Sequence, residues 1–284
     1  MSGLGETSAP VASLLADGPA LCLGIDPHAS LLDAWGLADS ADGVREFGLR
    51  AAEAARDAGT RIVKPQVAFY ERHGSLGIAA LEDVIAAARA AGLWVIADAK
   101  RGDIGSTMRG YADAWLRAGG ALEADALTVT PYLGLGALRP AVDAALAAGK
   151  ALFVLAATSN PEAAGLQLAT GPDGASVAGG ILQGVEALND ELGGTGPGPI
   201  GVVVGATIRP DDLGLDLAAA PRTPILAPGF GAQGARLGGI RATFGDATPR
   251  VIANVSRDAL GVGAAALAPR LRELAAELAT RAAA

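Results

Sequence analysis

Residues 76–100 read LGIAALEDVIAAARAAGLWVIADAK and place an alanine-rich stretch directly before a short apolar run that ends in charged residues. Apolar residues at helical spacing over Leu76–Ala91 predict a helix, and Gly92 follows where a left-handed C-cap favours glycine. The run Trp94–Ala99 is apolar on both faces, which is typical of a parallel strand covered on each side. The stretch therefore predicts one helix–strand unit.

The same alternation continues along the chain. Strands are predicted at Leu21–Ile25, Arg61–Lys64, Trp94–Ala99, Ala126–Thr130, Leu152–Ala156, Gly201–Val204, Pro224–Ala227 and Arg250–Asn254, and further helices at Leu138–Ala148, Val177–Leu192 and Ala264–Ala282. Eight strand–helix units predict an α/β fold, a (β/α)8 TIM barrel in which residues 1–284 form a single domain. A doubly wound open sheet is the alternative, although no GxGxxG follows the first strand. The glycine-rich stretches 171–180 and 193–199 are expected to be loops flanking one helix.

Composition narrows the classes of function. The chain has 22 Lys+Arg against 30 Asp+Glu, a formal net charge of −8, so no overall positive field would attract nucleic acid or an anionic membrane. One cysteine, Cys22, and two histidines exclude a disulfide framework and Cys- or His-rich metal cages. No signal-peptide pattern or bilayer-length apolar run occurs, so we expect a soluble cytoplasmic protein.

Polar residues end almost every predicted strand, where a barrel of this kind carries its reacting groups. In chain order these ends hold Asp26, Lys64, Asp98 with Lys100, Thr130, Thr158–Asn160, Gly205–Thr207, Gly229–Gly234, and Asn254 with Ser256 and Arg257. Any strand becomes polar where it meets water, but charge gathers at the first three ends. This clustering favours a site over a uniform surface.

The sequence DAKRGD at residues 98–103 is the most informative segment. Side chains two apart on a strand share a face, so Asp98 and Lys100 are expected to point together toward the barrel mouth. A structural salt bridge would explain this pair but leaves Asp103 and Lys64 without a role. Because nearby carboxylates favour protonated lysine, Lys100 is expected to be a cation, suited to donating a proton rather than forming a Schiff base.

The spacing DxKxxD at 98–103 resembles the signature of the orotidine 5'-phosphate decarboxylase family. Eight ordered segments, about one per predicted strand, support the resemblance: LCLGIDPH (21–28), VKPQVAFYE (63–71), DAKRGDIGST (98–107), TVTPYLG (128–134), TSNPE (158–162), VGAT (204–207), PGFGAQG (228–234) and NVSR (254–257). The set is similar to the longer-chain bacterial branch of the family, type 2.

The resemblance implies removal of CO2 from orotidine 5'-monophosphate to give uridine 5'-monophosphate in pyrimidine synthesis, with neither metal nor organic cofactor. By the motif, Lys100 would protonate C6 of the pyrimidine, and Asp98 would lie against the departing carboxylate. Lys64 would complete the charge network and reach the ribose, and Asp26 would bind ribose hydroxyls. A fixed ammonium at the reacting carbon would stabilise the transition state more than the substrate.

The resemblance also implies a partner. Asp103, Ile104 and Thr107 match residues that the family delivers into the neighbouring subunit's site. The implied assembly is therefore a homodimer with composite active sites.

The base and the phosphate of the nucleotide also need residues that bind them. Ser159 resembles the residue that binds the base edge, although its hydroxyl could instead cap the turn into Pro161. The glycine-rich loop with Gly231 and Gln233 follows the seventh strand, where barrels often bind phosphate, although it could be only a tight turn. Arg257 adds a cation whose fork geometry suits phosphate oxygens, and this favours the phosphate interpretation.

Three alternatives remain open. The first is a Mg2+-dependent sugar-phosphate decarboxylase or epimerase with the same spacing, in which Asp98, Asp103 or Glu71 would be metal ligands. The second is a class I aldolase with an imine on Lys100. The third is an inactive phosphate-ligand binding protein.

Overall fold

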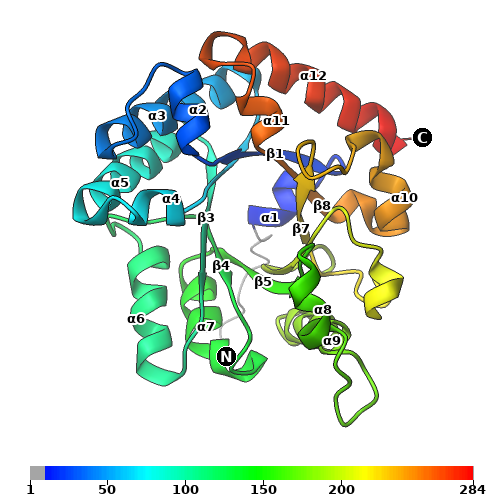
Figure 1. Ribbon diagram of the computed structural model, residues 1–284. Coiled ribbons are helices and arrows are strands. Elements are labelled where there is room, and N and C mark those ends of the chain that lie inside the picture. Colours follow the sequence, from blue (N-terminus) through cyan, green and yellow to red (C-terminus); the bar gives the residue numbers. More distant parts are fainter. Residues whose placement is uncertain (1–9, 284) are drawn as a thin grey trace.

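Eight parallel strands close into a barrel in chain order (Figure 1); the computed structural model describes residues 10–283. The strands are β1 (Ala20–Ile25), β2 (Ile62–Pro65), β3 (Trp94–Arg101), β4 (Ala126–Val129), β5 (Ala151–Ala157), β6 (Ile200–Val204), β7 (Ile225–Phe230) and β8 (Val251–Val255). β8 pairs with β1 and closes the ring. The predicted (β/α)8 barrel is confirmed, and the open-sheet alternative is wrong because no edge is left between β8 and β1.

Helices surround the ring. They are α2 (Ala29–Ala34), α3 (Ala41–Ala58), α4 (Ala68–Glu71), α5 (Gly74–Ala90), α6 (Gly105–Leu116), α7 (Arg139–Ala147), α8 (Ala164–Gln167), α9 (Val177–Glu191), α10 (Ile240–Phe244), α11 (Arg257–Leu260) and α12 (Ala264–Ala283). Short 3-10 helices are η1 (Leu135–Leu138), η2 (Pro161–Ala163), η3 (Pro210–Leu213), η4 (Leu237–Gly239) and η5 (Gly245–Arg250). Only η3 stands between β6 and β7, so that unit lacks its expected α-helix. Across residues 10–283, no helix is both long and apolar enough to cross a membrane.

The predicted elements differ from the observed ones mainly at their ends. Gly92 and Gly149 follow α5 and α7 with φ of 78° and 64°, the left-handed conformation expected of a glycine C-cap. The loop expected over residues 171–180 is too long, because α9 begins at Val177. Ser176 caps this helix by accepting a hydrogen bond from the Gly179 N–H at 2.9 Å.

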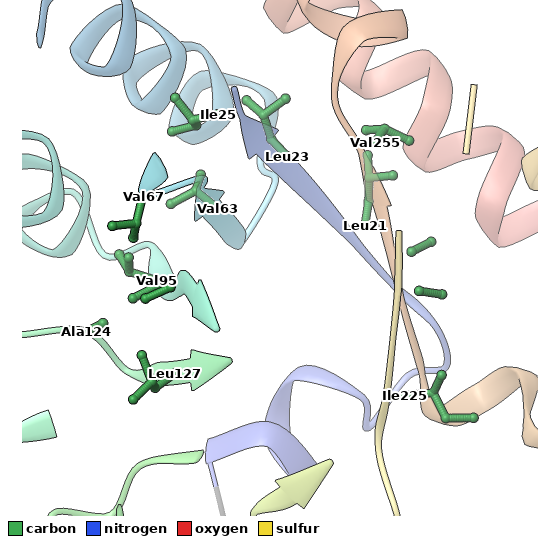
Figure 2. Packing of buried hydrophobic residues seen from close by; sticks show 14 of the residues in the cluster. Leu21, Leu23, Ile25, Val63, Val67, Val95, Ala124, Leu127, Ile225 and Val255 are labelled. Carbon is green, nitrogen blue, oxygen red and sulfur yellow. The ribbon is translucent and has the colours of Figure 1, made fainter. Parts of the chain in front are cut away.

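The outer face of the strands packs against the helices. Figure 2 shows part of this layer, in which Leu21, Leu23, Val63, Val95 and Val255 come from neighbouring strands. All five side chains are at most 7 % exposed. Burial of this kind stabilises the barrel and fixes where each strand ends.

The inner face fills the barrel. Cys22, Ile62, Ile96 and Phe153 belong to one buried cluster that also contains Val11, Leu14 and Leu15 from the first helical segment. α1 (Pro10–Leu14) lies near the middle of the ring in Figure 1. Arg61, just before β2, donates hydrogen bonds to the carbonyls of Ser13 and Leu14. The amino end of the barrel is thereby covered, and the carboxyl end remains for a site.

Candidate active site

A pocket of about 250 Å³ opens at the carboxyl ends of the strands. The predicted site residues in its lining are Asp26, Lys64, Asp98, Lys100, Ser159, Gln233 and Arg257. They come from strand ends and loops all around the ring, as expected if the barrel brings its strand ends to one mouth.

Two lysines bind the carboxylate of Asp98. The Lys64 ammonium lies 2.7 Å from Oδ2 and the Lys100 ammonium 2.5 Å from Oδ1. The Lys64 and Asp98 side chains are only 5 % and 9 % exposed, whereas that of Lys100 is 43 % exposed. Both lysines line the pocket, but the Lys64 side chain is almost fully buried at its inner end, whereas the Lys100 side chain is open to it.

Electrostatic attraction between Asp98 and the two lysines outweighs the cost of burying the charges of Asp98 and Lys64. Burial alone would raise the pKa of Asp98, but the charges of Lys64 and Lys100 and their hydrogen bonds hold it well below its usual range. Burial would lower the pKa of Lys64, but attraction to Asp98 and Asp26 raises it above its ordinary value. The Asp98 carboxylate and the Lys64 ammonium are therefore both charged at neutral pH.

The strand that carries Asp98 and Lys100 is not regular. Ala97 pairs with Leu127 and Arg101 with Val129, so β3 bulges between these two pairs. Lys100 has a φ of 49°, the one positive value among non-glycine residues 10–283. Asp98 and Lys100 do meet, as expected from the sequence, but through a bulge and not through simple strand alternation.

The β1 end of the pocket carries Asp26. Its Oδ2 accepts a hydrogen bond from the Ser256 hydroxyl at 2.5 Å, while its Oδ1 is buried without a hydrogen-bond partner among the described residues. Asn254, from β8, also lines the pocket and is 5 % exposed, and its Oδ1 is likewise unpaired within the described chain. Two acceptor oxygens are therefore buried without a partner beneath this side of the pocket.

Two loops meet across the mouth. The Ser159 hydroxyl, after β5, donates a hydrogen bond of 3.3 Å to Gln233 Oε1, after β7. Arg257 is exposed at the start of α11 and lines the pocket beside the β7 loop. Gly231 does not line the pocket; it has φ 82°, and a Cβ there would lie 2.4 Å from the Cβ of Asp258. Glycine at this position therefore lets the loop approach α11.

The residues matched to a neighbouring subunit lie outside this chain's own pocket. Asp103 Oδ1 accepts a hydrogen bond from the Ile104 N–H at 2.8 Å, and the Ile104 side chain is 60 % exposed. Thr107 is exposed in the first turn of α6. None of the three appears in the pocket lining.

Sequence reasoning gave no role to several residues that line the pocket, among them Gln66, Thr128 and Asn254. Gln66 Oε1 lies 3.5 Å from the Lys100 ammonium, and Thr128 contacts both Asp98 and Lys100. Strand alternation could have indicated two of them, because side chains two residues apart share a face. Thr128 is two residues before Thr130, and Gln66 is two residues after Lys64, both of which were predicted to lie at the mouth.

Two of the three carboxylates named as possible metal ligands are engaged in ion pairs. Asp98 is bound by two ammonium groups, and Glu71 forms an ion pair with Arg101. Within residues 10–283, no three His, Cys, Asp or Glu side chains form a group able to hold a metal ion. A Mg2+ ion at Asp98 would have to displace a lysine.

Known proteins resemble the chain over most of its length. The family model described as "Orotidine 5'-phosphate decarboxylase / HUMPS family" matches residues 19–264. The orotidine 5'-phosphate decarboxylase of Salinispora arenicola is 49% identical over 243 residues, which cover 86% of this chain and 85% of the relative. That of Streptomyces coelicolor is 49% identical over 246 residues, with the same coverage.

Solved structures of proteins with this name also resemble the chain. A Streptomyces avermitilis crystal structure with a proposed assignment as orotidine 5'-phosphate decarboxylase superposes with a TM-score of 0.90 at 46% identity and covers 100% of both chains. The Leishmania donovani OMP decarboxylase gives a TM-score of 0.74 at 29% identity over 96% of this chain and 98% of its own. The resemblance inferred from the motifs is confirmed. The chain belongs to the orotidine 5'-phosphate decarboxylase / HUMPS family, and it is an enzyme of the carboxy-lyase class.

Proposed function

We propose that the chain removes CO2 from orotidine 5'-monophosphate and releases uridine 5'-monophosphate, as its relatives' names indicate for them. The observation that carries the proposal is the Lys100 ammonium, held by Asp98 and exposed in a pocket at the barrel mouth. An ammonium in this place can supply a proton to a carbon that loses a carboxylate.

In the proposed reaction, the C–C bond to the carboxylate breaks, its electron pair remains on the pyrimidine C6, and Lys100 delivers a proton there. The ammonium attracts the developing carbanion more strongly than it attracts the neutral ring carbon, so it favours the transition state. Asp98 keeps the Lys100 ammonium in place and would lie beside the departing carboxylate. Lys64 anchors the other oxygen of Asp98 from inside the barrel.

The remaining pocket residues suit a nucleotide. Asp26, which lines the pocket at the end of β1, would accept hydrogen bonds from ribose hydroxyls, as the family resemblance implies. Ser159 would bind the base edge, and Gln233, which accepts a hydrogen bond from Ser159, would close over the phosphate. Arg257 would bind phosphate oxygens together with the loop that contains Gly231.

We further propose a homodimer in which Asp103, Ile104 and Thr107 complete the neighbouring site. The support is three exposed apolar side chains on neighbouring loops: Ile104 is 60 % exposed, while Tyr132 and Leu133, in the loop after β4, are 76 % and 54 % exposed. The Thr130 N–H donates to the Arg101 carbonyl, so the loops after β3 and β4 leave the barrel side by side, and a patch formed there would suit an interface. Cytoplasmic location and a single domain over residues 1–284 stay predictions.

The decisive experiment follows the absorbance of orotidine 5'-monophosphate in the presence of purified chain and excess chelator. We expect complete conversion to uridine 5'-monophosphate. Activity that appears only with added Mg2+ would favour the sugar-phosphate alternative. Borohydride trapping of substrate on Lys100 would favour the aldolase alternative, and tight binding without turnover would favour the inactive binding protein.

A further inference from the structure

Thr128 stands opposite the bulge that carries the two charged residues of β3. The register pairs Ala97 with Leu127 and Arg101 with Val129, which leaves residues 98–100 facing the single β4 residue Thr128. Two of the three, Asp98 and Lys100, belong to the charged centre of the site. The backbone ladder is interrupted here, so a side chain must take over its hydrogen bonds.

The Thr128 hydroxyl forms two such hydrogen bonds, as the acceptor in one and as the donor in the other. The backbone N–H of Lys100 donates to Oγ1 at 3.0 Å, which makes the hydroxyl oxygen the acceptor in that bond. The hydroxyl's own hydrogen is then free to be donated to Asp98 Oδ1, also at 3.0 Å. Thr128 is only 1 % exposed, so water does not compete for either bond.

The two hydrogen bonds of Thr128 involve Asp98 and Lys100, the same two residues that the Lys100–Asp98 ion pair joins. Asp98 Oδ1 receives both the Thr128 hydroxyl and the Lys100 ammonium, and the backbone of Lys100 adopts the left-handed conformation that residues with a Cβ normally avoid. A valine at position 128 would fill a similar volume but would leave the Lys100 N–H without this acceptor. Packing alone therefore does not account for the hydroxyl.

We propose that Thr128 is a positioning residue for the decarboxylation, an inference that rests on the proposed function. Its hydroxyl holds the Lys100 backbone in the left-handed conformation and keeps Oδ1 of Asp98 turned toward the Lys100 ammonium. The ammonium is thus placed before substrate arrives. Loss of the hydroxyl would shift the proton donor relative to the reacting carbon, and small displacements of a reacting group lower the rate steeply.

The test compares Thr128→Val with Thr128→Ser. The valine variant is expected to lower kcat by about 10- to 100-fold while KM stays within about threefold, because the ground-state contacts of the nucleotide are untouched. The serine variant restores the hydroxyl and is expected to retain kcat within about threefold of the unchanged chain. A kcat for Thr128→Val close to that of the unchanged chain, a loss confined to KM, or a serine variant as slow as the valine variant would overturn the proposal.

Thr223→Val is the matched control. Thr223 is 0 % exposed, and its hydroxyl donates to the carboxylate of Glu186 at 2.7 Å, outside the pocket. It is expected to lower thermal stability without lowering kcat, which separates positioning from a general loss of stability. If Thr128→Val does not fold, Thr128→Ala is compared with Thr128→Ser by the same criteria.

An unchanged chain that fails to consume orotidine 5'-monophosphate would defeat the proposed function but not decide the role of Thr128. A crystal structure of Thr128→Val then decides it. A Lys100 φ that becomes negative, with the ammonium moved away from Asp98, supports the positioning role. A φ that remains near 49° overturns it.

Discussion

Lys64 and Lys100 bind opposite oxygens of one carboxylate, yet their surroundings differ: the Lys64 side chain is 5 % exposed and that of Lys100 is 43 % exposed. Burial suits Lys64 to hold Asp98 in place. Exposure to the pocket suits Lys100 to meet a substrate. Two residues of the same type are therefore expected to respond differently to the same substitution.

Lys100→Ala is expected to lower kcat for orotidine 5'-monophosphate by at least about 1000-fold, because it removes the proposed proton donor and the charge that stabilises the carbanion. Circular dichroism should remain that of the unchanged chain, since Asp98 keeps Lys64 as a partner. The measurement is steady-state turnover at saturating substrate. Residual activity above a tenth of the original would remove Lys100 from the proposed role.

Lys64→Ala is the matched comparison. It leaves a buried carboxylate with only the more exposed lysine, so the free energy of unfolding should fall by about 3 kcal/mol, more than in Lys100→Ala. Urea unfolding of the two variants side by side checks this order. Equal losses would show that the difference in burial has no energetic consequence.

Arg257→Ala is expected to weaken binding of uridine 5'-monophosphate by about 10-fold or more and to leave binding of uridine unchanged, because only the nucleotide carries the phosphate. Isothermal titration with both ligands measures the contrast. Arg272→Ala is the control, since Arg272 lies outside the pocket and donates to the Asp57 carbonyl. Equal loss of affinity for both ligands would contradict a phosphate contact.

Mixed dimers of Lys100→Ala and Asp103→Ala chains are expected to regain activity. If Asp103 serves the neighbouring site, each mixed dimer has one site with both changes and one with neither, so the purified mixed dimer should have about half of the original activity. Co-expression with two affinity tags isolates the mixed dimer for assay. No recovery in verified mixed dimers would argue that each chain uses its own Asp103.

Glu123 offers a pH prediction away from the site. Burial opposes its ionisation, but the Lys150 ammonium, the Gly119 N–H and Arg89 bring its pKa from 4.5 to about 2. A lowered carboxyl pKa stabilises the folded chain above the unfolded value, about 4.3, and this contribution is lost as pH falls toward about 2. Glu123→Gln should therefore cost about 1 kcal/mol at pH 7 and progressively less below pH 4.5.

Urea unfolding at pH 7, 5, 4 and 3 measures that difference. Glu46→Gln is the control, because Glu46 forms only an exposed pair with Arg50 and its replacement should change the free energy of unfolding little. A loss in Glu123→Gln that stays constant from pH 7 to pH 3 would contradict the linkage.

The strands were predictable because each is a short apolar run that becomes polar where the barrel meets solvent. The same reasoning predicted that Asp26, Lys64 and Asp98 lie at strand ends, and all three line the pocket. α3 was not among the helices named from the sequence. Its buried face mixes Val44 and Phe47 with glycine and alanine, and such small residues give a weak periodic signal.

The bulge at Lys100 could not be predicted in this way. Lysine does not favour a left-handed backbone, and the conformation arises from the register between β3 and β4, which joins residues 28 to 30 positions apart. The partnership of Thr128 with Asp98 depends on the same register. The local sequence predicts which polar side chains lie at the strand ends, but the pairing of strands in the closed barrel determines which of these side chains contact each other.

The cluster of Val11, Leu14 and Leu15 at the amino end of the barrel also limits how ligands can enter and leave the pocket. Because the described residues close the amino end of the barrel, the pocket at the carboxyl ends, beside Arg257, is the route left for ligands. In the proposed reaction, substrate would enter and CO2 would leave through this same mouth. A nucleotide bound there would hinder the escape of CO2, so release of CO2 is expected to depend on movement of the bound nucleotide.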